Sequence, residues 1–196
     1  MGKTTPKVYL GETGETVEDG CVAMHVRLKS GKVADLGIVN VFKQGEEDSK
    51  KFNTTGFTVT EAIINGEREN FADYLKRIQA DTKLPLVAAY MGAMVNISFQ
   101  SVDMNKKEVT FYAPNFTGIE YKSAAPIEDY VQEFTGHIPD AIEEVAFSCN
   151  CILNYLYSEL EGKKTGAFMG PVTFGEVAYQ LLNQTLGYLK IQDAVL

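Results

Sequence analysis

The stretch LVAAYMGAMVNISFQSVDMNKKEVTFY, residues 86–112, decides the fold class because it predicts three β-rich segments in succession. They are Leu86 to Tyr90, Met94 to Val102 and Lys107 to Tyr112, and residues 103–106 predict a turn between the last two. In the second segment, apolar and polar residues alternate with the period of two that gives a strand one buried and one polar face. The apolar set is Val95, Ile97 and Phe99, and the polar set is Asn96, Ser98 and Gln100. We therefore expect a meander of strands.

A helix is predicted directly before this stretch. Asn70 is suited to cap it, Asp73 follows three residues later, and apolar residues recur at helical spacing from Phe71 to Ile78. We expect the helix to end near Ala80. It covers one face of the predicted sheet.

Further towards the amino terminus, the sequence predicts a hairpin and a loop. Cys21 to Leu28 and Ala34 to Phe42 are β-prone runs, and the turn between them contains Gly31. The highly charged segment over residues 43–51 lacks apolar periodicity and predicts a solvated loop. Residues 1–20 predict a polar arm or edge strand, in which only residues 8–10 are strand-like.

After the meander, short helices and a buried strand alternate. The expected elements are helices over Ile127 to Phe134, Pro139 to Glu144, residues 150–160 and Phe174 to Leu186, and strands over Val145 to Phe147 and Tyr188 to Ile191. The sequence therefore predicts an α+β fold, with a mostly antiparallel sheet covered by about three helices, near residues 70–80, 150–160 and 174–186. A single domain over residues 21–196 is expected.

Composition excludes several classes of partner. The 196 residues carry 18 basic and 26 acidic side chains, a formal charge of −8, without a basic cluster, which argues against nucleic acid and anionic membranes. No apolar run approaches the ~18 residues of a membrane span, and the first residues lack the pattern of a signal peptide. A cytoplasmic protein is expected, and the odd count of three cysteines favours reduced thiols.

The tail of the chain concentrates small polar residues where strands and helices are predicted to meet. A buried strand that ends in Ser148, Cys149 and Asn150 and continues into a helix presents free amides, which favour anionic ligand groups. A second turn, from Gly170 to Glu176, is similar, although its Thr173 and Glu176 also fit a capping box that merely starts a helix. The predicted ligand-binding residues are Ser148, Cys149, Asn150, Thr173, Gly175 and Glu176.

Two alternatives to ligand binding are a catalytic cysteine and a metal site. Cys149 at a helix start is a candidate nucleophile for a cysteine-dependent hydrolase or transferase, but neither His25 nor His137 is placed beside it by the sequence. Cys149 and Cys151 with one distant histidine give at most three soft ligands, fewer than a structural zinc site needs. No metal and no cofactor is therefore expected. A third reading is a purely structural subunit.

The segments FSCNCILNYLYSELEG and GPVTFGEVAYQLLNQTLGYLKI, over about the last fifty residues, resemble the end of a FIST-C domain. In that family, a strand ending in Phe-Ser-Cys precedes a Gly-Glu turn and then an Asn-Gln-Thr segment. The stretches PLVAAYMGAMVNISFQSVD, EVTFYAPNFTGIEYKSA and IEDYVQEF fit the same domain in the order and type of their elements. The matching motif positions are Phe147, Ser148, Cys149, Gly170, Thr173, Gly175, Glu176, Asn183 and Thr185.

This resemblance implies a sensory module that binds small ligands, amino acids among them, and signals through an attached domain. The chain departs from the family in one chemical respect, because family members commonly carry an Arg shortly after the cysteine, whereas this sequence has no Arg after Arg77. It also carries no recognisable output domain. A separate signalling partner is therefore expected, together with a homodimer that covers exposed sheet edges.

Overall fold

The structure of the protein, a computed structural model, describes residues 5–90, 93–138, 145–163, 168–178 and 180–194. The chain divides into two compact units, one formed by residues 1–33 with 193–196 and the other by residues 34–192. The division into an arm over residues 1–20 and a domain over residues 21–196 stays a prediction. No helix in the described ranges is both long and apolar enough to cross a membrane.

The smaller unit contains an antiparallel hairpin of β1 (Val8–Leu10) and β2 (Glu15–Val17). The amide of Gly14, at φ 71°, donates to the carbonyl of Leu10 at 2.8 Å and closes the turn. Residues 21–28, expected as a strand, form none, and no strand in the described part of the chain pairs with them. That prediction is wrong because strand propensity forms a strand only where cross-strand partners exist.

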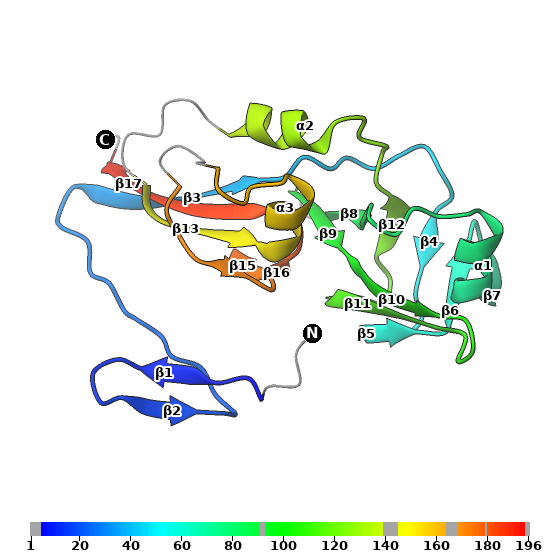
Figure 1. The fold of residues 1–196 in the computed structure, drawn as a ribbon, viewed down its shortest axis with the longest axis horizontal. Helices are drawn as coiled ribbons and strands as arrows, with labels where there is room; N and C mark the ends of the chain where they lie inside the picture. The colour runs from blue at the N-terminus through cyan, green and yellow to red at the C-terminus, as the bar shows by residue number, and fades with distance from the viewer. Residues whose placement is uncertain (1–4, 91–92, 139–144, 164–167, 179, 195–196) are drawn as a thin grey trace. The chain divides into compact units, whose positions relative to one another are not determined.

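The larger unit is built mainly from short strands (Figure 1). Their bounds are β3 (Lys32–Val39), β4 (Lys50–Lys51), β5 (Gly56–Val59), β6 (Glu61–Ile64), β7 (Glu67–Asn70), β8 (Leu86–Tyr90), β9 (Ala93–Ile97), β10 (Phe99–Asp103), β11 (Glu108–Asn115), β12 (Glu120–Ser123), β13 (Val145–Cys151), β14 (Val172–Thr173), β15 (Glu176–Ala178), β16 (Gln180–Leu182) and β17 (Leu186–Asp193). Within the described residues they form sheets in the orders β7-β6-β4-β12-β8-β9, β10-β11-β5 and β14-β13-β17-β3, and the hairpin β15-β16.

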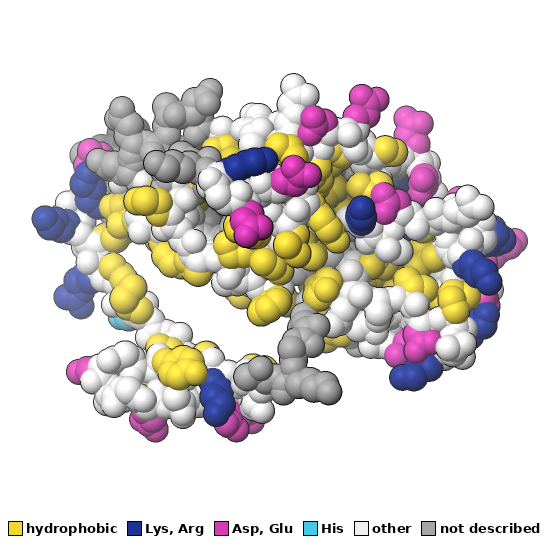
Figure 2. All heavy atoms as spheres, viewed as in Figure 1, with side chains coloured by type: hydrophobic (Ala, Val, Ile, Leu, Met, Phe, Trp, Pro, Cys, Tyr) yellow, Lys and Arg dark blue, Asp and Glu magenta, His cyan; other side chains and the backbone are white. Residues whose placement is uncertain are grey.

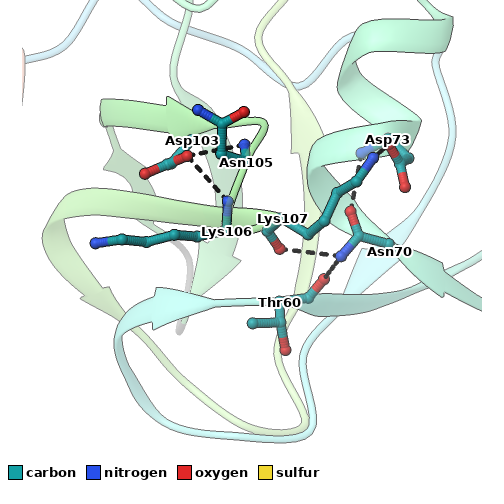
Figure 3. Close-up of polar contacts among 7 residues, drawn as sticks. All are labelled: Thr60, Asn70, Asp73, Asp103, Asn105, Lys106 and Lys107. Carbon is teal, nitrogen blue, oxygen red and sulfur yellow. Dashed lines mark hydrogen bonds and ion pairs between the residues drawn. The ribbon is translucent and has the colours of Figure 1, made fainter.

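Pairing is mostly antiparallel, as the sequence predicts. The six-stranded and three-stranded sheets are antiparallel throughout, whereas β13 pairs antiparallel with β17 and in parallel with β14. The strands predicted over residues 86–112 are present as β8 to β11, but they form no single meander. The segment from Met94 to Val102 divides into β9 and β10, and the hairpins β8-β9 and β10-β11 belong to different sheets. The predicted turn over residues 103–106 is confirmed, since Asp103 accepts hydrogen bonds from the amides of Asn105 and Lys106 (Figure 3).

Three helices lie in the described residues: α1 (Phe71–Arg77), α2 (Tyr130–His137) and α3 (Ile152–Tyr157). The predicted helix over Pro139 to Glu144 lies outside the described residues. Three hydrophobic clusters lie in the described part of the larger unit, and the third and smallest consists of Val95, Ala178 and Leu182. The first surrounds α1 with aromatic rings, Phe52, Phe71, Phe99, Phe111 and Tyr121 among them, and the second joins α2 to β8 and β17 through Phe42, Val87, Phe134 and Leu186.

The expected helix from Phe174 to Leu186 is wrong. Glu176–Ala178 and Gln180–Leu182 instead pair as the antiparallel strands β15 and β16, and burial alternates along β15, where Glu176 and Ala178 are buried and Val177 is exposed. The apolar residues that fit a helical stripe also fit this period of two. Helix formation would place Asn183 and Gln184 on a helix surface, whereas both side chains are buried in polar contacts.

Two further expectations need correction. The segment over residues 43–51 is expected to be a solvated loop, but Lys50 begins β4 and is 0% exposed. Its burial is tolerated because its ammonium donates to the carbonyl of Asp48 at 2.8 Å. The strand expected to be buried at Val145 to Phe147 is exposed in its first half, and Phe147 is 55% exposed. Both predictions rest on the polarity of the segment, which does not indicate what other parts of the chain pack against it.

Asn70 caps α1 as predicted and also anchors it to two loops (Figure 3). Its Oδ1 accepts from the amide of Asp73 at 3.0 Å, and its Nδ2 donates to the carbonyls of Thr60 at 2.8 Å and Lys107 at 3.0 Å. The Lys107 ammonium contacts the Asp73 carboxylate. One amide side chain therefore fixes the helix start against β5 and β11.

We predict that Asn70→Ala lowers the free energy of unfolding by about 2 to 3 kcal/mol, since it removes a cap worth about 1 kcal/mol and two hydrogen bonds worth about 1 kcal/mol each. Asn70→Ser keeps a capping oxygen and loses only the amide donors, so it should cost less. Urea unfolding followed by circular dichroism measures both. Equal costs for the two variants would contradict the capping role.

Candidate functional site

The predicted tail site is built on β13 and the segment that follows Gly170. In the parallel pairing of β13 with β14, Asn150 lies opposite Val172 and Cys151 lies opposite Thr173. Gly170 lies so close to β13 that a Cβ atom there would be 1.6 Å from the carbonyl oxygen of Ser148, so the contact requires glycine. Successive side chains of a strand point to opposite faces, which divides the predicted site residues into separate groups.

Ser148 and Asn150 form the first group and line a small cavity. The cavity has a volume of about 110 Å³, and Lys163 also lines it. Ser148 is 3% exposed, and the Oδ1 atom of Asn150 accepts a hydrogen bond from Nδ2 of Asn154 at 3.3 Å. The residues that line the cavity therefore include a serine, an asparagine and an exposed lysine.

Cys149, Thr173 and Gly175 form the second group, in contact with one another. Sγ of Cys149 lies 3.3 Å from Oγ1 of Thr173, and this hydroxyl donates to the carbonyl of Gly175 at 3.0 Å. Thr173 therefore closes a turn after β14 and caps no helix. Within the described residues, the thiol of Cys149 contacts a hydroxyl, and His137 instead contacts the carbonyl of Glu133 in α2.

Glu176 is separate from both groups and is buried. The residue is 2% exposed, one carboxyl oxygen accepts from the hydroxyl of Thr185, and the other has no hydrogen-bond partner in the described part of the chain. Burial raises the pKa of Glu176 to about 8. The side chain is therefore a neutral acid at neutral pH. Burial, and next the Glu176 carboxyl, raise the pKa of the buried Cys151 thiol.

A buried polar network joins the tail to β9 and to the loop after α1. Nδ2 of Asn96 donates to the carbonyl of Asn183 at 3.1 Å, and Oγ of Ser98 donates to Oε1 of Gln184 at 2.7 Å. Nε2 of Gln184 donates to the carbonyl of Lys83 at 3.2 Å. All four of these side chains are at most 2% exposed, so unpaired they would be costly.

The same segment holds the start of α3. The amide of Cys151 donates to the carbonyl of Thr185 at 3.1 Å. The hydroxyl of Tyr130, on α2, donates to Oδ1 of Asn154 and is also hydrogen-bonded to Gln184. Burial raises the pKa of Tyr130, which keeps this hydroxyl protonated. The network thus reaches α2, α3, β9 and β13.

The sequence places Asn183 and Thr185 among the motif residues but misses their partners Asn96, Ser98 and Gln184. The polar residues of this segment are expected to face solvent, whereas Asn96 is 0% and Ser98 is 2% exposed. One signal was present in the sequence. Three consecutive polar residues, 183–185, do not suit the end of an amphipathic helix.

Exposed apolar side chains surround the second group of site residues. Phe147, Phe174 and Val177 are 55%, 67% and 78% exposed. Figure 2 shows hydrophobic side chains gathered over β13, the β15-β16 hairpin and α3. Apolar surface that is contiguous in this way is typical of a contact site for another molecule.

The chain matches a family described as a family of unknown function, DUF6976, over residues 1–192. No curated protein and no solved structure matches the chain. The predicted FIST resemblance and the ligand-binding site therefore stay predictions.

We predict that Glu176→Gln changes how stability depends on pH. Between pH 4.5 and about 8, the unfolded chain releases the Glu176 proton and the folded chain keeps it, so the free energy of unfolding falls as the pH rises through this window. The slope from this group approaches about 1.4 kcal/mol per pH unit. Glu176→Gln keeps the shape and removes this slope.

Urea unfolding of both proteins at pH 5, 6.5 and 8 measures the effect. The wild type should lose stability relative to Glu176→Gln as the pH rises. Glu67→Gln, at an exposed position of β7, controls for the loss of one negative charge. A constant difference between wild type and Glu176→Gln at all three pH values contradicts a neutral buried acid.

Proposed function

This chain belongs to the DUF6976 family of unknown function, and we propose that it is a small-ligand-binding sensory module that does no chemistry on its ligand. One observation carries the proposal. Alternate residues of β13 line a cavity on one face, Ser148 and Asn150, and meet the exposed apolar surface on the other, Phe147 and Cys149. A ligand in the cavity would therefore contact the strand whose other face is available to a partner.

The cavity favours a small, amino-acid-like ligand. Its volume of about 110 Å³ holds roughly three to four water molecules, each of which takes up about 30 Å³. Ser148 and Asn150 offer neutral hydrogen-bonding groups, and Lys163 offers a cation for a carboxylate. In this proposal Lys163 takes the place of the Arg that FIST-C domains commonly carry after the cysteine.

The signal would leave through a separate protein that binds the exposed apolar side chains Phe147, Phe174 and Val177. A homodimer through the same surface is the competing arrangement. The three cysteines are free, which supports a cytoplasmic location because free thiols persist in reducing compartments. In this proposal Cys149 is a surface contact residue, since its thiol contacts the hydroxyl of Thr173, which is no base at neutral pH.

We predict that wild type binds a small amino acid, with glycine, alanine and serine as the first probes in isothermal titration calorimetry. Asn150→Ala and Lys163→Met should each weaken binding at least tenfold, because a charge-assisted contact contributes roughly 1.5 to 3 kcal/mol. Asn53→Ala, at an exposed position, is the control. Failure of the wild type to bind any amino acid or small carboxylate would remove this proposal.

We predict that iodoacetamide alkylates exposed Cys21 faster than half-buried Cys149 at pH 7, and Cys151 slowest, because burial raises the pKa of Cys151 and covers it. Mass spectrometry of tryptic peptides follows the three rates. Rapid and preferential alkylation of Cys149 would instead favour the alternative function, a cysteine-dependent hydrolase or transferase.

A further inference from the structure

A hollow of about 500 Å³ lies beside α1, and none of the predicted tail residues lines it. Its volume falls within the range of roughly 300 to 1,000 Å³ that is usual for small-molecule sites. Tyr74 of α1, Ile78 directly after the helix, Leu84 and Phe99 supply the apolar wall. The larger unit therefore contains a hollow of ordinary ligand size apart from the tail cavity.

The charged side chains that line this hollow are all acidic: Glu47, Asp48 and Asp81. An adjoining hollow of about 350 Å³ shares Glu47 and Asp48 and adds Glu46 and Glu120 beside a single Lys122. The combined space therefore holds more negative than positive charge. An anionic ligand would be repelled from it.

Asp48 is held in place as an anion. Nδ2 of Asn65 donates to one carboxylate oxygen at 2.6 Å, and the hydroxyl of Tyr74 donates to the other at 3.0 Å. These hydrogen bonds, from Asn65 first and Tyr74 second, lower the pKa of Asp48. The carboxylate is therefore preorganised for a cation that enters beside Tyr74.

Of the lining carboxylates, Glu120 pairs with Lys51 at 3.3 Å, whereas Glu47, Asp48 and Asp81 form no ion pair within the described residues. The guanidinium of Arg77 is bound to both carboxylate oxygens of Glu69, each at 2.7 Å. The buried ammonium of Lys50 donates to the backbone carbonyl of Asp48 at 2.8 Å, and burial lowers its pKa. A cation supplied by a ligand would complete the charge balance of the hollow.

We propose that this hollow binds a small organic cation, a protonated amine on an apolar body. The amine would lie against Asp48 and Asp81, and the apolar body against Ile78, Leu84 and Phe99. Both parts are needed, because a hydrated inorganic ion gains nothing from apolar walls and a neutral apolar ligand gains nothing from the carboxylates.

The wall of the hollow is also attached to the tail. Leu84 lines the hollow, and the carbonyl of its neighbour Lys83 accepts the hydrogen bond from Gln184. A bound amine would thus contact a loop that the polar network ties to the start of β17. Binding of the amine does not depend on the function proposed for the tail cavity.

The test uses phenethylamine as the probe and 2-phenylethanol as its neutral counterpart, titrated into the full chain at pH 7 and followed by isothermal titration calorimetry and by shifts of the aromatic NMR signals. The amine should bind and perturb Tyr74 and Phe99, and the alcohol should bind at least tenfold more weakly. Equal binding of the two, or no binding of the amine, overturns the proposal.

Matched variants locate the site. Asp48→Asn keeps a hydrogen-bond acceptor for the hydroxyl of Tyr74 and removes the charge, so it should weaken amine binding at least tenfold. Asp81→Asn, at an exposed position, should weaken amine binding by a similar factor. Asp103→Asn in the β10-β11 turn and Asn53→Ala at an exposed position should leave amine binding unchanged. Unaltered amine binding in both Asp48→Asn and Asp81→Asn contradicts the proposal. Displacement of the amine by millimolar Mg²⁺ also contradicts it, because the hollow would then not be specific for an organic cation.

Discussion

The pairing of Asn96 on β9 and Ser98, directly after β9, with the polar tail segment is the interaction on which the arrangement of the larger unit depends. Ser98 meets Gln184 and Asn96 meets Asn183, all buried and nearly 90 residues apart in the sequence. Hydrogen bonds in such surroundings are stronger than in water, and unpaired partners are costly. The tail therefore has one position in which its polar groups are satisfied.

This pairing places both candidate binding regions. Gln184 occupies the left-handed region at φ 52°, which costs a residue with a side chain about 1 to 2 kcal/mol. The hydrogen bonds of its side chain to Ser98, to the carbonyl of Lys83 and to Tyr130 offset this cost. From there the chain runs to Thr185, which binds Glu176, and into β17, which pairs with β13. The tail cavity and the acidic hollow are thus opposite ends of one connected set of contacts.

The sequence predicts elements well where local rules decide them. Asn70 is a cap because its side chain satisfies a helix amide within three residues, and the strands β8 to β11 follow a local alternation, although their division between two sheets does not. Local chemistry fails where a distant segment supplies the partner. The strands β15 and β16 were expected as a helix, and Ser98 was expected in solvent, because the tail that buries it lies far along the sequence.

The same limit applies to the site. The sequence identifies Ser148, Cys149 and Glu176 as a group. In the structure, strand alternation places Ser148 on the cavity face of β13 and Cys149 on the opposite face, and Glu176 is buried apart from both. A double-mutant cycle on Ser98→Ala and Gln184→Ala, measured by urea unfolding, tests most directly whether the polar pairing holds the tail in place. We expect a coupling free energy of about 1 kcal/mol or more between the two sites. Additive effects, with a coupling close to zero, would contradict this account.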